Sequence, residues 1–315
     1  MTLFANQDFS ELTRLGVKLK NYKSSKWFYK KVSRGLDAGS LKEPVVYVYR
    51  GFDKRYIYYD KSVIHRMCED IMKYMEIPGN MAILTTKQLI QPPFNHVFIT
   101  RENLTDIISL STKSKENAFL FPLLISASEP NIKREFINSI KEEYQIKASN
   151  LSIAKVIFNY IYAILHSKTY RERYAKGLGK DFPLIPFPSN IERLRSISNL
   201  GENLISVHLL DSDQIDIRRY EINEGSDIVK SIQYKNEENR IYINDFQYFG
   251  NITLEMWDFK IGTIQQIQDW LKRRQGRRLS TKDFDYFLKM LDSIRISIEE
   301  IKKIDEEYHQ EFLNA

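Results

Sequence analysis

Two neighbouring segments are the most informative about the fold, namely Tyr160-Ile-Tyr-Ala-Ile-Leu-His-Ser-Lys-Thr-Tyr-Arg-Glu-Arg-Tyr-Ala-Lys176 and the exit Asp181-Phe-Pro-Leu-Ile-Pro-Phe-Pro188. Apolar residues recur at helical spacing over residues 151–166, which predicts a helix with one wide face in a core. A second, shorter helix over residues 170–176 should end at Gly177 in a left-handed C-cap. The prolines of the exit lack a backbone N–H and predict an irregular, extended strip after the helices.

The sequence before this helix pair divides into two parts. Residues 1–44 are predicted to form a lead-in segment of helices and loops. Residues 45–129 carry short β-branched and aromatic runs, which predict a strand-rich part. The expected strands are Val45–Tyr49, Tyr56–Tyr59, Met81–Thr85, His96–Ile99 and Ile107–Ser111. Apolar residues four apart also predict a helix across Ser62–Met75.

Residues 130–315 are predicted to form a helical support part. Helical patterns cover residues 130–176 and 189–210, and a small antiparallel sheet is expected within 215–243. Its strand-like runs are Ile215–Tyr220, Ile228–Tyr234 and Arg240–Ile243. Ser280-x-x-Asp283 resembles a capping box and should open one long terminal helix, packed on a partner helix such as Thr263–Arg274. The predicted fold class is therefore α+β.

Composition restricts the class of protein. A chain of 315 residues with 43% apolar composition can bury a real core and hold two subdomains. The single cysteine, Cys68, excludes a disulfide framework, and the first residues lack the features of a signal peptide, so the cytoplasm is the expected compartment. Charges interrupt every apolar run well before the roughly 20 residues that cross a bilayer, so no membrane partner is expected. The net charge of +6 favours a polyanionic partner.

Several motifs, in a fixed order, resemble one enzyme family. They are Tyr49-Arg50-Gly-Phe52-Asp53-Lys-Arg55, His96-Val-Phe-Ile-Thr100, Phe121-Pro-Leu-Leu124, the helix pair with its Asp-Phe-Pro-x-Ile-Pro exit, Leu200-Gly201, His208-Leu-Leu210, Trp257-x-Phe259-x-Ile261-Gly262 and Trp270-Leu-Lys-x-Arg274-x-Gly276-Arg277. Together they resemble the C-terminal specificity region of single-polypeptide Type ISP and Type IIG restriction–modification enzymes, over roughly residues 45 to 305. Gly51 departs from the pattern, because the family usually has proline there.

The resemblance implies a sequence-specific module that recognises double-stranded DNA. In that family, methyl transfer from S-adenosylmethionine and double-strand cleavage belong to parts N-terminal to this region. The resemblance therefore implies that this chain has no catalytic, cofactor-binding or metal-binding residues. S-adenosylmethionine and Mg are expected only in the associated catalytic domains. The implied partners are double-stranded DNA and the adenine methyltransferase and nuclease/helicase domains of the same system.

The candidate DNA-binding residues are cations, an amide and a tyrosine in predicted turns and loops. An arginine fork matches guanine or phosphate, glutamine matches adenine, and lysine donates to guanine or phosphate. The candidates are Arg50, Lys54, Arg55, Tyr56, Lys61, Arg66, Lys87, Gln88, Arg101, Lys113, Lys115, Arg273, Arg274, Arg277 and Arg278. Phosphate positioning is favoured for the arginines of the first turn, and base reading for the loops 85–91 and 111–117.

Each assignment has a structural alternative. Asp53 can pair with Arg50 or Arg55, so that the turn motif has a purely structural role as a staple between its strands. Arginines 273–278 can stabilise the C-terminal end of a helix dipole. Polar loops are also simply solvated in many proteins. His166 and His208 are predicted to be hydrogen-bonded core residues, since no histidine shows metal-ligand spacing.

Two other functions remain open on the sequence alone. The chain could itself methylate or cut DNA, although Gln91-Pro-Pro-Phe94 begins with glutamine where adenine methyltransferases have Asn, Asp or Ser, and no glycine-rich cofactor loop precedes it. It could also be a protein-docking module whose terminal helix binds a partner subunit.

Overall fold

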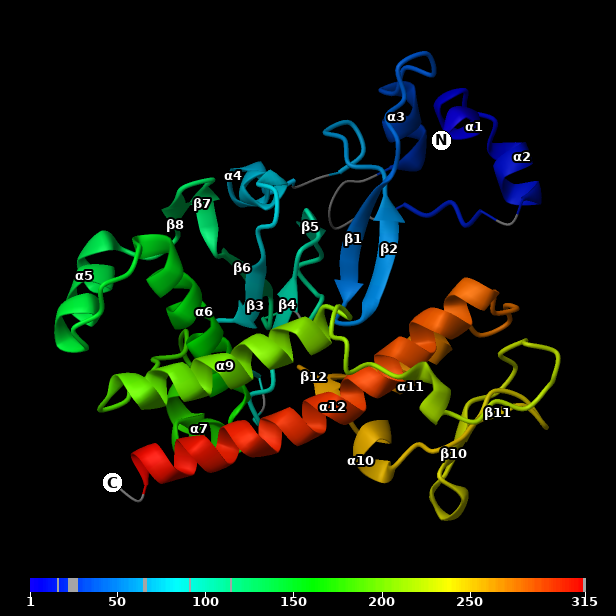
Figure 1. Cartoon of the computed structure of the whole chain (residues 1–315). Coiled ribbons are helices and arrows are strands. Elements are labelled where there is room, and N and C mark those ends of the chain that lie inside the picture. Colours follow the sequence, from blue (N-terminus) through cyan, green and yellow to red (C-terminus); the bar gives the residue numbers. More distant parts are fainter. Residues whose placement is uncertain (16, 22–27, 65–66, 91, 114, 314–315) are drawn as a thin grey trace.

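A computed structural model describes residues 1–15, 17–21, 28–64, 67–90, 92–113 and 115–313. Short N-terminal helices stand at one end of the molecule, and they are α1 (Thr2–Ala5), α2 (Phe9–Arg14) and α3 (Tyr29–Arg34) (Figure 1). The ring of Phe9 lies edge-on to that of Tyr29, 5.0 Å away, and packs α2 against α3. No helix in the described ranges combines the length and apolar character that a bilayer crossing requires.

A twisted hairpin follows the N-terminal helices. Strands β1 (Val45–Arg50) and β2 (Asp53–Ile57) pair in antiparallel fashion, and β5 (Leu104–Thr105) adds to β1 in parallel. The first predicted strand is confirmed, whereas the second begins three residues before its predicted start at Tyr56. The turn is tight at Gly51 because a Cβ there would lie 2.7 Å from Ile261 and 2.8 Å from the Gln266 side chain. Gly51, which stands where the family usually has proline, is therefore in close contact with the C-terminal half of the chain.

A second sheet lies at the centre of the molecule. Its order is β4 (Val97–Thr100), β3 (Ala82–Thr86) and β6 (Ala118–Pro122), all antiparallel, and every residue of β3 and β4 is buried. The predictions for β3 and β4 are confirmed. A small hairpin of β7 (Leu124–Ser126) and β8 (Glu129–Pro130) follows.

Two predictions for this half are wrong. The run Ile107–Ser111 forms turns instead of a strand, and its Leu110 carbonyl accepts from the Thr263 N–H across the molecule (3.1 Å). The predicted helix Ser62–Met75 is reduced to α4 (Glu69–Met72) and the 3-10 helix η1 (Lys73–Glu76). The Asp60 carboxylate accepts from the Ser62 N–H (2.9 Å), and such local bonds compete with a helix.

Long helices make up the other side of the molecule. They are α6 (Asn150–His166), α9 (Ile191–His208) and α12 (Thr281–Phe312), with the shorter α5 (Arg134–Glu143), α7 (Lys168–Arg173) and α8 (Ala175–Leu178) around them. The predicted α6 stripe is buried except for Leu151 in the first turn, which is exposed, and Ile161, which is half-buried. Helix α9 crosses α6 at Gly201, where a Cβ would lie 2.0 Å from the Asn159 carbonyl oxygen. The left-handed C-cap predicted at Gly177 is wrong, because α8 runs on through Leu178.

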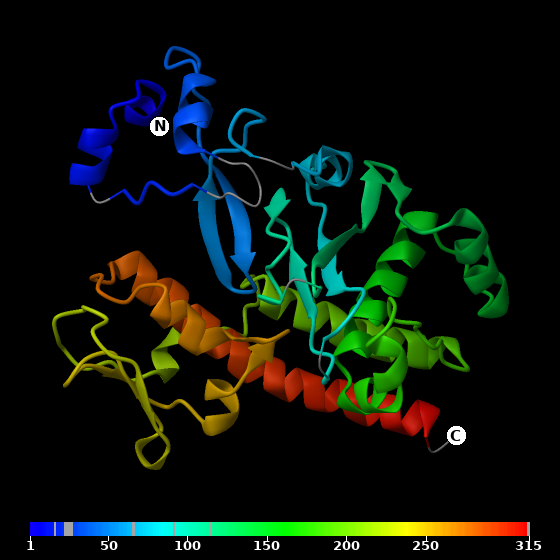
Figure 2. The ribbon, with the colours of Figure 1, turned by 180° about the vertical axis from the view of Figure 1, so that it is seen from behind.

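Helix α12 begins as predicted. Ser280 and Asp283 form a reciprocal capping box, with the Asp283 carboxylate accepting from the Ser280 N–H at 2.9 Å. Helix α12 runs alongside α9 and α6 (Figures 1 and 2), and the Ser293 hydroxyl donates to the Val207 carbonyl of α9 (2.8 Å). The predicted partner, now α11 (Gln266–Lys272), contacts the first half of α12, where Trp270 stacks on Phe287.

The small C-terminal sheet is displaced from its predicted position. Its order is β11 (Tyr248–Phe249), β10 (Arg240–Tyr242) and β9 (Gln233–Lys235), all antiparallel. The predicted strand Ile215–Tyr220 is wrong, because the Asp216 side chain caps the 3-10 helix η2 (Ile217–Arg219) there. Short elements complete this part, namely η3 (Asn236–Glu238), α10 (Leu254–Trp257), β12 (Lys260–Ile261) and β13 (Ile264–Gln265).

Candidate nucleic-acid interface

Candidate arginines from the β1–β2 hairpin and from the end of α11 meet on one tyrosine ring. Tyr49 of β1 lies beneath the guanidinium carbon of Arg55, 3.9 Å from the ring centroid, and that of Arg273 lies at 5.5 Å. Arg55 comes from β2, and Arg273 is the C-cap of α11, so the ring joins parts of the chain more than two hundred residues apart. We call Tyr49, Arg50, Asp53, Arg55, Arg273 and Arg274 the Tyr49 cluster.

Asp53 neutralises the centre of this cluster. Its side chain is 3% exposed and accepts from Arg55 at 2.6 Å and from Arg274 at 3.1 Å. Arg274 also lies over the ring of Trp270 (3.5 Å to the centroid) and donates to the Trp270 carbonyl at the end of α11. Both structural alternatives that the sequence left open, the Asp53 staple and the helix-end arginine, are therefore present.

Arg50 lies inside the protein. Its guanidinium donates to the carbonyls of Tyr49 (2.7 Å) and Ile108 (2.8 Å), and the residue is buried. It thus ties β1 to the segment after β5 and offers no surface to a ligand in this conformation. Arg55 and Arg273 have side chains about one-third exposed (35% and 37%) and provide the accessible guanidinium groups of the cluster. A hydrogen bond to Asp269 raises the pKa of Arg273 and keeps it charged.

The other candidates of the strand-rich part lie at the surface. The Tyr56 side chain on β2 is 76% exposed. Lys54 pairs with Glu102 (2.8 Å), Lys61 with Glu69 (3.1 Å), and Arg101 with Asp211. Arg66 lies outside the described residues.

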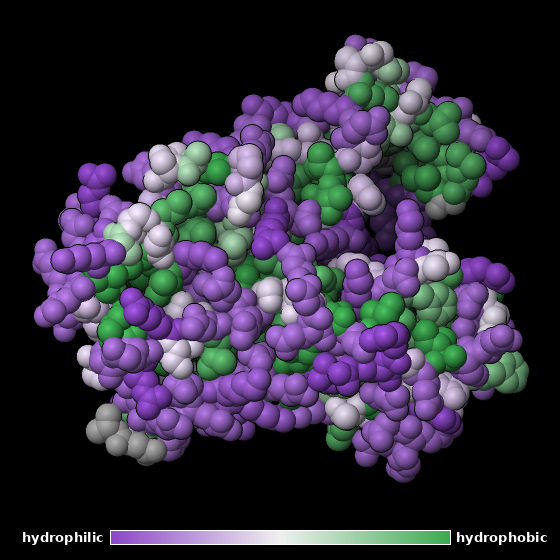
Figure 3. Space-filling model, in the orientation of Figure 1, coloured by the Kyte–Doolittle hydropathy of each residue, from purple (hydrophilic) through white to green (hydrophobic). Residues whose placement is uncertain are grey.

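Arg277 and Arg278 occupy a rigid turn between α11 and α12. The Arg277 carbonyl accepts from the Val229 N–H (3.0 Å), and the Leu279 N–H donates to the Asp227 carbonyl (2.8 Å). Both arginines are exposed, and among residues 115–313 neither guanidinium forms an ion pair or hydrogen bond. The surface is hollowed between the N-terminal helices and the part of the molecule that holds this turn, with polar residues on the floor of the hollow and apolar residues along its border with the N-terminal helices (Figure 3).

The two loops predicted to read bases lie beside the central sheet. Lys87 follows β3 and is placed between Asp181 (3.5 Å) and the Phe182 ring, while Gln88 is exposed. In the second loop Lys115 is exposed and Lys113 is half-buried. The second loop also contains Glu116, which the sequence placed in a polar surface loop but which is fully buried.

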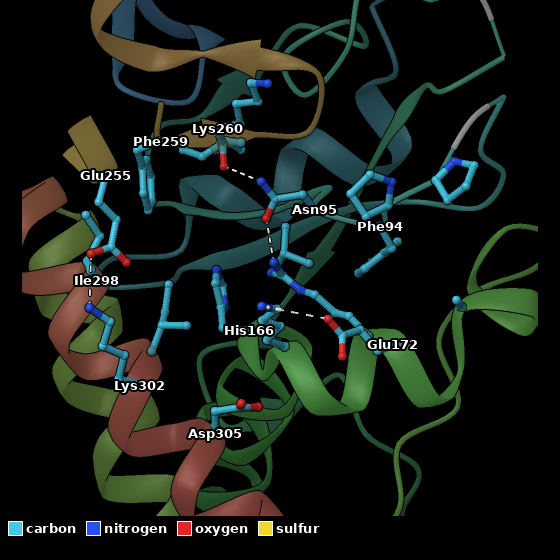
Figure 4. A pocket seen from close by; sticks show the side chains of 18 residues that line it. Phe94, Asn95, His166, Glu172, Glu255, Phe259, Lys260, Ile298, Lys302 and Asp305 are labelled. Atoms are coloured by element: carbon cyan, nitrogen blue, oxygen red, sulfur yellow. Dashed lines mark hydrogen bonds and ion pairs between the residues drawn. The ribbon is translucent and has the colours of Figure 1, made fainter. Parts of the chain in front are cut away.

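A cavity of about 680 Å³ lies elsewhere, between α7, α12 and the segment that leads into β4 (Figure 4). Arg171 of α7 lines it and donates to the Asn95 side chain (2.5 Å), and Asn95 donates to the Lys260 carbonyl.

His166 on the wall of this cavity bonds the Tyr162 carbonyl, and His208 bonds the Tyr162 hydroxyl (2.6 Å), so both are core histidines as predicted. Burial lowers the pKa of both. In the part of the chain described, no three His, Cys, Asp or Glu residues gather in a metal-binding arrangement.

Comparisons with solved structures reveal the same fold in larger proteins. A nuclease-deletion mutant of the Type ISP restriction–modification enzyme LlaGI, in complex with a DNA substrate mimic, is 20% identical, with a TM-score of 0.62 over 97% of this chain and 25% of its own. The DrdV–DNA complex is 17% identical, with a TM-score of 0.68 over 97% of this chain and 32% of its own. The ATP-dependent Type ISP enzyme LlaBIII bound to DNA is 18% identical, with a TM-score of 0.60 over 88% of this chain and 19% of its own.

This chain therefore spans between a fifth and a third of the length of these structural neighbours. No curated protein matches its sequence. The family described as the Type ISP C-terminal specificity domain matches residues 1–297, which is nearly the whole chain. This protein belongs to the Type ISP C-terminal specificity domain family.

Proposed function

We propose that this chain binds double-stranded DNA sequence-specifically and directs a separate adenine methyltransferase and nuclease to their target. The observation that carries the proposal is the convergence of Arg55 and Arg273 on the Tyr49 ring, a few residues before the turn that exposes Arg277 and Arg278. Exposed cations on a rigid support attract phosphates and fix the register of a duplex. The structural neighbours LlaGI, DrdV and LlaBIII are complexes with DNA or a DNA substrate mimic, which supports the same assignment.

The proposal divides the candidate residues by their accessibility. Arg277, Arg278, Arg55, Arg273 and Tyr56 would contact the DNA backbone, and Lys54, Lys61 and Arg101 would do so if their surface ion pairs opened. Such pairs contribute only about 0–1 kcal/mol each, so phosphate can replace the carboxylate. The loops of Lys87, Gln88, Lys113 and Lys115 would read bases. Arg50 and Arg274 would hold the cluster together from within.

Catalysis would belong to other domains of the same system. On this proposal S-adenosylmethionine and Mg act there, the chain works in the cytoplasm, and its parts 1–44, 45–129 and 130–315 serve as lead-in, DNA reader and support. A methyl-transfer assay with radiolabelled S-adenosylmethionine separates this proposal from the rival in which the chain is itself a methyltransferase. Incorporation of label by the isolated chain would support the rival.

The salt dependence of DNA binding tests the proposal. Log affinity should fall linearly with log salt, because each neutralised phosphate contributes a slope of about −0.9. The double variant Arg277→Ala/Arg278→Ala should lower the magnitude of that slope by about 1.8, since two phosphate contacts are lost. Fluorescence anisotropy with a short labelled duplex, between about 50 and 200 mM salt, measures both slopes.

A matched control removes the same charge elsewhere. Lys133 and Arg134 are adjacent exposed cations at the start of α5, at the opposite end of the molecule from the α11–α12 turn (Figure 1). Lys133→Ala/Arg134→Ala should leave the slope unchanged. An equal fall in both double variants would mean that DNA responds only to net charge. Absence of binding at low salt would favour a protein-docking module instead.

A further inference from the structure

Glu116 is a buried carboxylate in the second of the two loops that are proposed to read bases, and it bonds the backbone of the first. Its side chain is 0% exposed. One carboxylate oxygen accepts from the Ile90 N–H at 2.7 Å, and the other accepts from the Ser111 hydroxyl at 2.5 Å. The second oxygen also lies 3.3 Å from Nε2 of His96.

The carboxylate stays charged in this setting. Burial acts to raise the pKa of Glu116, but the hydrogen bonds from Ser111 and the Ile90 N–H outweigh it and hold that pKa below its usual value. Burial lowers the pKa of His96 and so favours the neutral ring, and the tautomer with its proton on Nε2 donates to Glu116. The three donors thus all serve one anion.

These three donors come from separate segments. Ile90 lies in the loop that carries Lys87 and Gln88, whereas Ser111 opens the loop that carries Lys113 and Lys115. His96 leads into β4. Ser111 is held from a further direction, because its hydroxyl accepts from the Thr263 hydroxyl at 3.0 Å.

A purely structural role explains this carboxylate poorly. Replacing a buried ionic group by apolar residues of similar volume is often neutral or stabilising, because desolvation offsets the electrostatic gain. A carboxylate does, however, fix the direction of each donor, which an apolar side chain does not do. Because Glu116 bonds Ile90 in one loop and Ser111 in the other, it controls the relative geometry of the two loops.

We propose that Glu116 is a positioning residue for target specificity, which locks the Lys87–Gln88 loop and the Lys113–Lys115 loop into one reading surface without touching DNA. This inference rests on the proposed function. It predicts that the two loops discriminate bases only while Glu116 holds them in register. Contacts to the DNA backbone, made at the Tyr49 cluster and the α11–α12 turn, do not depend on it.

The test compares wild type with Glu116→Gln on two duplexes. One is the duplex most enriched by the wild-type chain from a random library, and the other is its scrambled counterpart. Glutamine keeps the shape but removes the charge and one acceptor oxygen, so the affinity ratio should fall about tenfold, the size of one lost base contact. Affinity for the scrambled duplex should stay unchanged. Glu129→Gln, at an exposed carboxylate on β8, should alter neither value.

Hydrogen exchange gives a readout without DNA. The Ile90 amide should exchange about tenfold faster in Glu116→Gln, because its bond to the carboxylate is weakened. If that variant fails to fold, Ser111→Ala removes one of the three donors and should lower the affinity ratio in the same direction. An unchanged ratio in a folded variant overturns the inference and leaves the proposed function standing. A wild-type chain that enriches no sequence overturns both.

Discussion

Replacing Asp53 by asparagine should destabilise the protein through the Tyr49 cluster. The carboxylate is almost fully buried and pairs with both Arg55 and Arg274. Removing one partner of a buried ion pair costs about 3–5 kcal/mol, because the other charge stays buried without compensation. That range sets the upper limit here.

Two features of the cluster reduce this cost. Arg55 is one-third exposed, so its ion pair with Asp53 contributes to the free energy of unfolding as a surface pair does, at most about 1 kcal/mol. Arg274 is only 13% exposed, but Asp283 lies 3.5 Å away and the Trp270 ring covers it. We therefore expect Asp53→Asn to lower the free energy of unfolding by about 2–3 kcal/mol. Urea denaturation should show an earlier midpoint with an unchanged slope.

A double-mutant cycle that combines Asp53→Asn with Arg274→Met isolates the interaction energy of this ion pair. Because the two side chains are in direct contact, the coupling energy should lie between about 1 and 3 kcal/mol. Asp245→Asn, at an exposed carboxylate in the β10–β11 turn, is the matched control and should change stability by less than about 0.5 kcal/mol. A coupling energy below about 0.5 kcal/mol would refute the role assigned to Asp53.

Three further predictions concern the helical side. Gly201→Ala should lower stability by about 1–3 kcal/mol in thermal denaturation, because its Cβ meets the α6 backbone; a neutral result would contradict the tight crossing. Ser280→Ala should cost about 1 kcal/mol by removing the α12 capping box, with Thr281→Ala as the neighbouring control. Stability should fall as pH drops below about 6.5, by about 1.4 kcal/mol per pH unit for each histidine. Burial lowers the pKa of His208 to about 3 and that of His166 well below its usual value, so only the unfolded chain takes up these protons, and a flat pH profile would count against this burial.

Long periodic segments were predictable from the sequence, and short ones were not. Helices α6, α9 and α12 repeat their apolar pattern over several turns, so packing and pattern agree. The failures at 62–75 and 215–220 share a cause, since Asp60 and Asp216 each bond a backbone N–H two residues later and divert the chain. At 107–111 the contact that replaces a strand comes from Thr263, which no local pattern contains.

For the candidate site, the sequence indicated which cations matter but not which of them are accessible. One signal was present, because Val48 and Arg50 are two residues apart on a strand and so share its buried face. The partners of Arg50 and the meeting of Arg273 with Tyr49 required the tertiary structure. Glu116 had no signal at all, since its loop is polar throughout.

The arrangement of carboxylates separates two kinds of arginine. Asp53 and Asp283 accompany Arg274, and Asp269 accompanies Arg273, so the charge of the Tyr49 cluster is largely balanced within the protein. In the described part, no carboxylate accompanies the arginines of the α11–α12 turn. Substituting the buried Asp53 should therefore change mainly the free energy of unfolding, whereas substitutions in the turn should change mainly the salt slope of DNA binding. The test measures the free energy of unfolding and the salt slope for both Asp53→Asn and Arg277→Ala/Arg278→Ala. If the two groups of arginines did not differ in role, both quantities would change together in each variant.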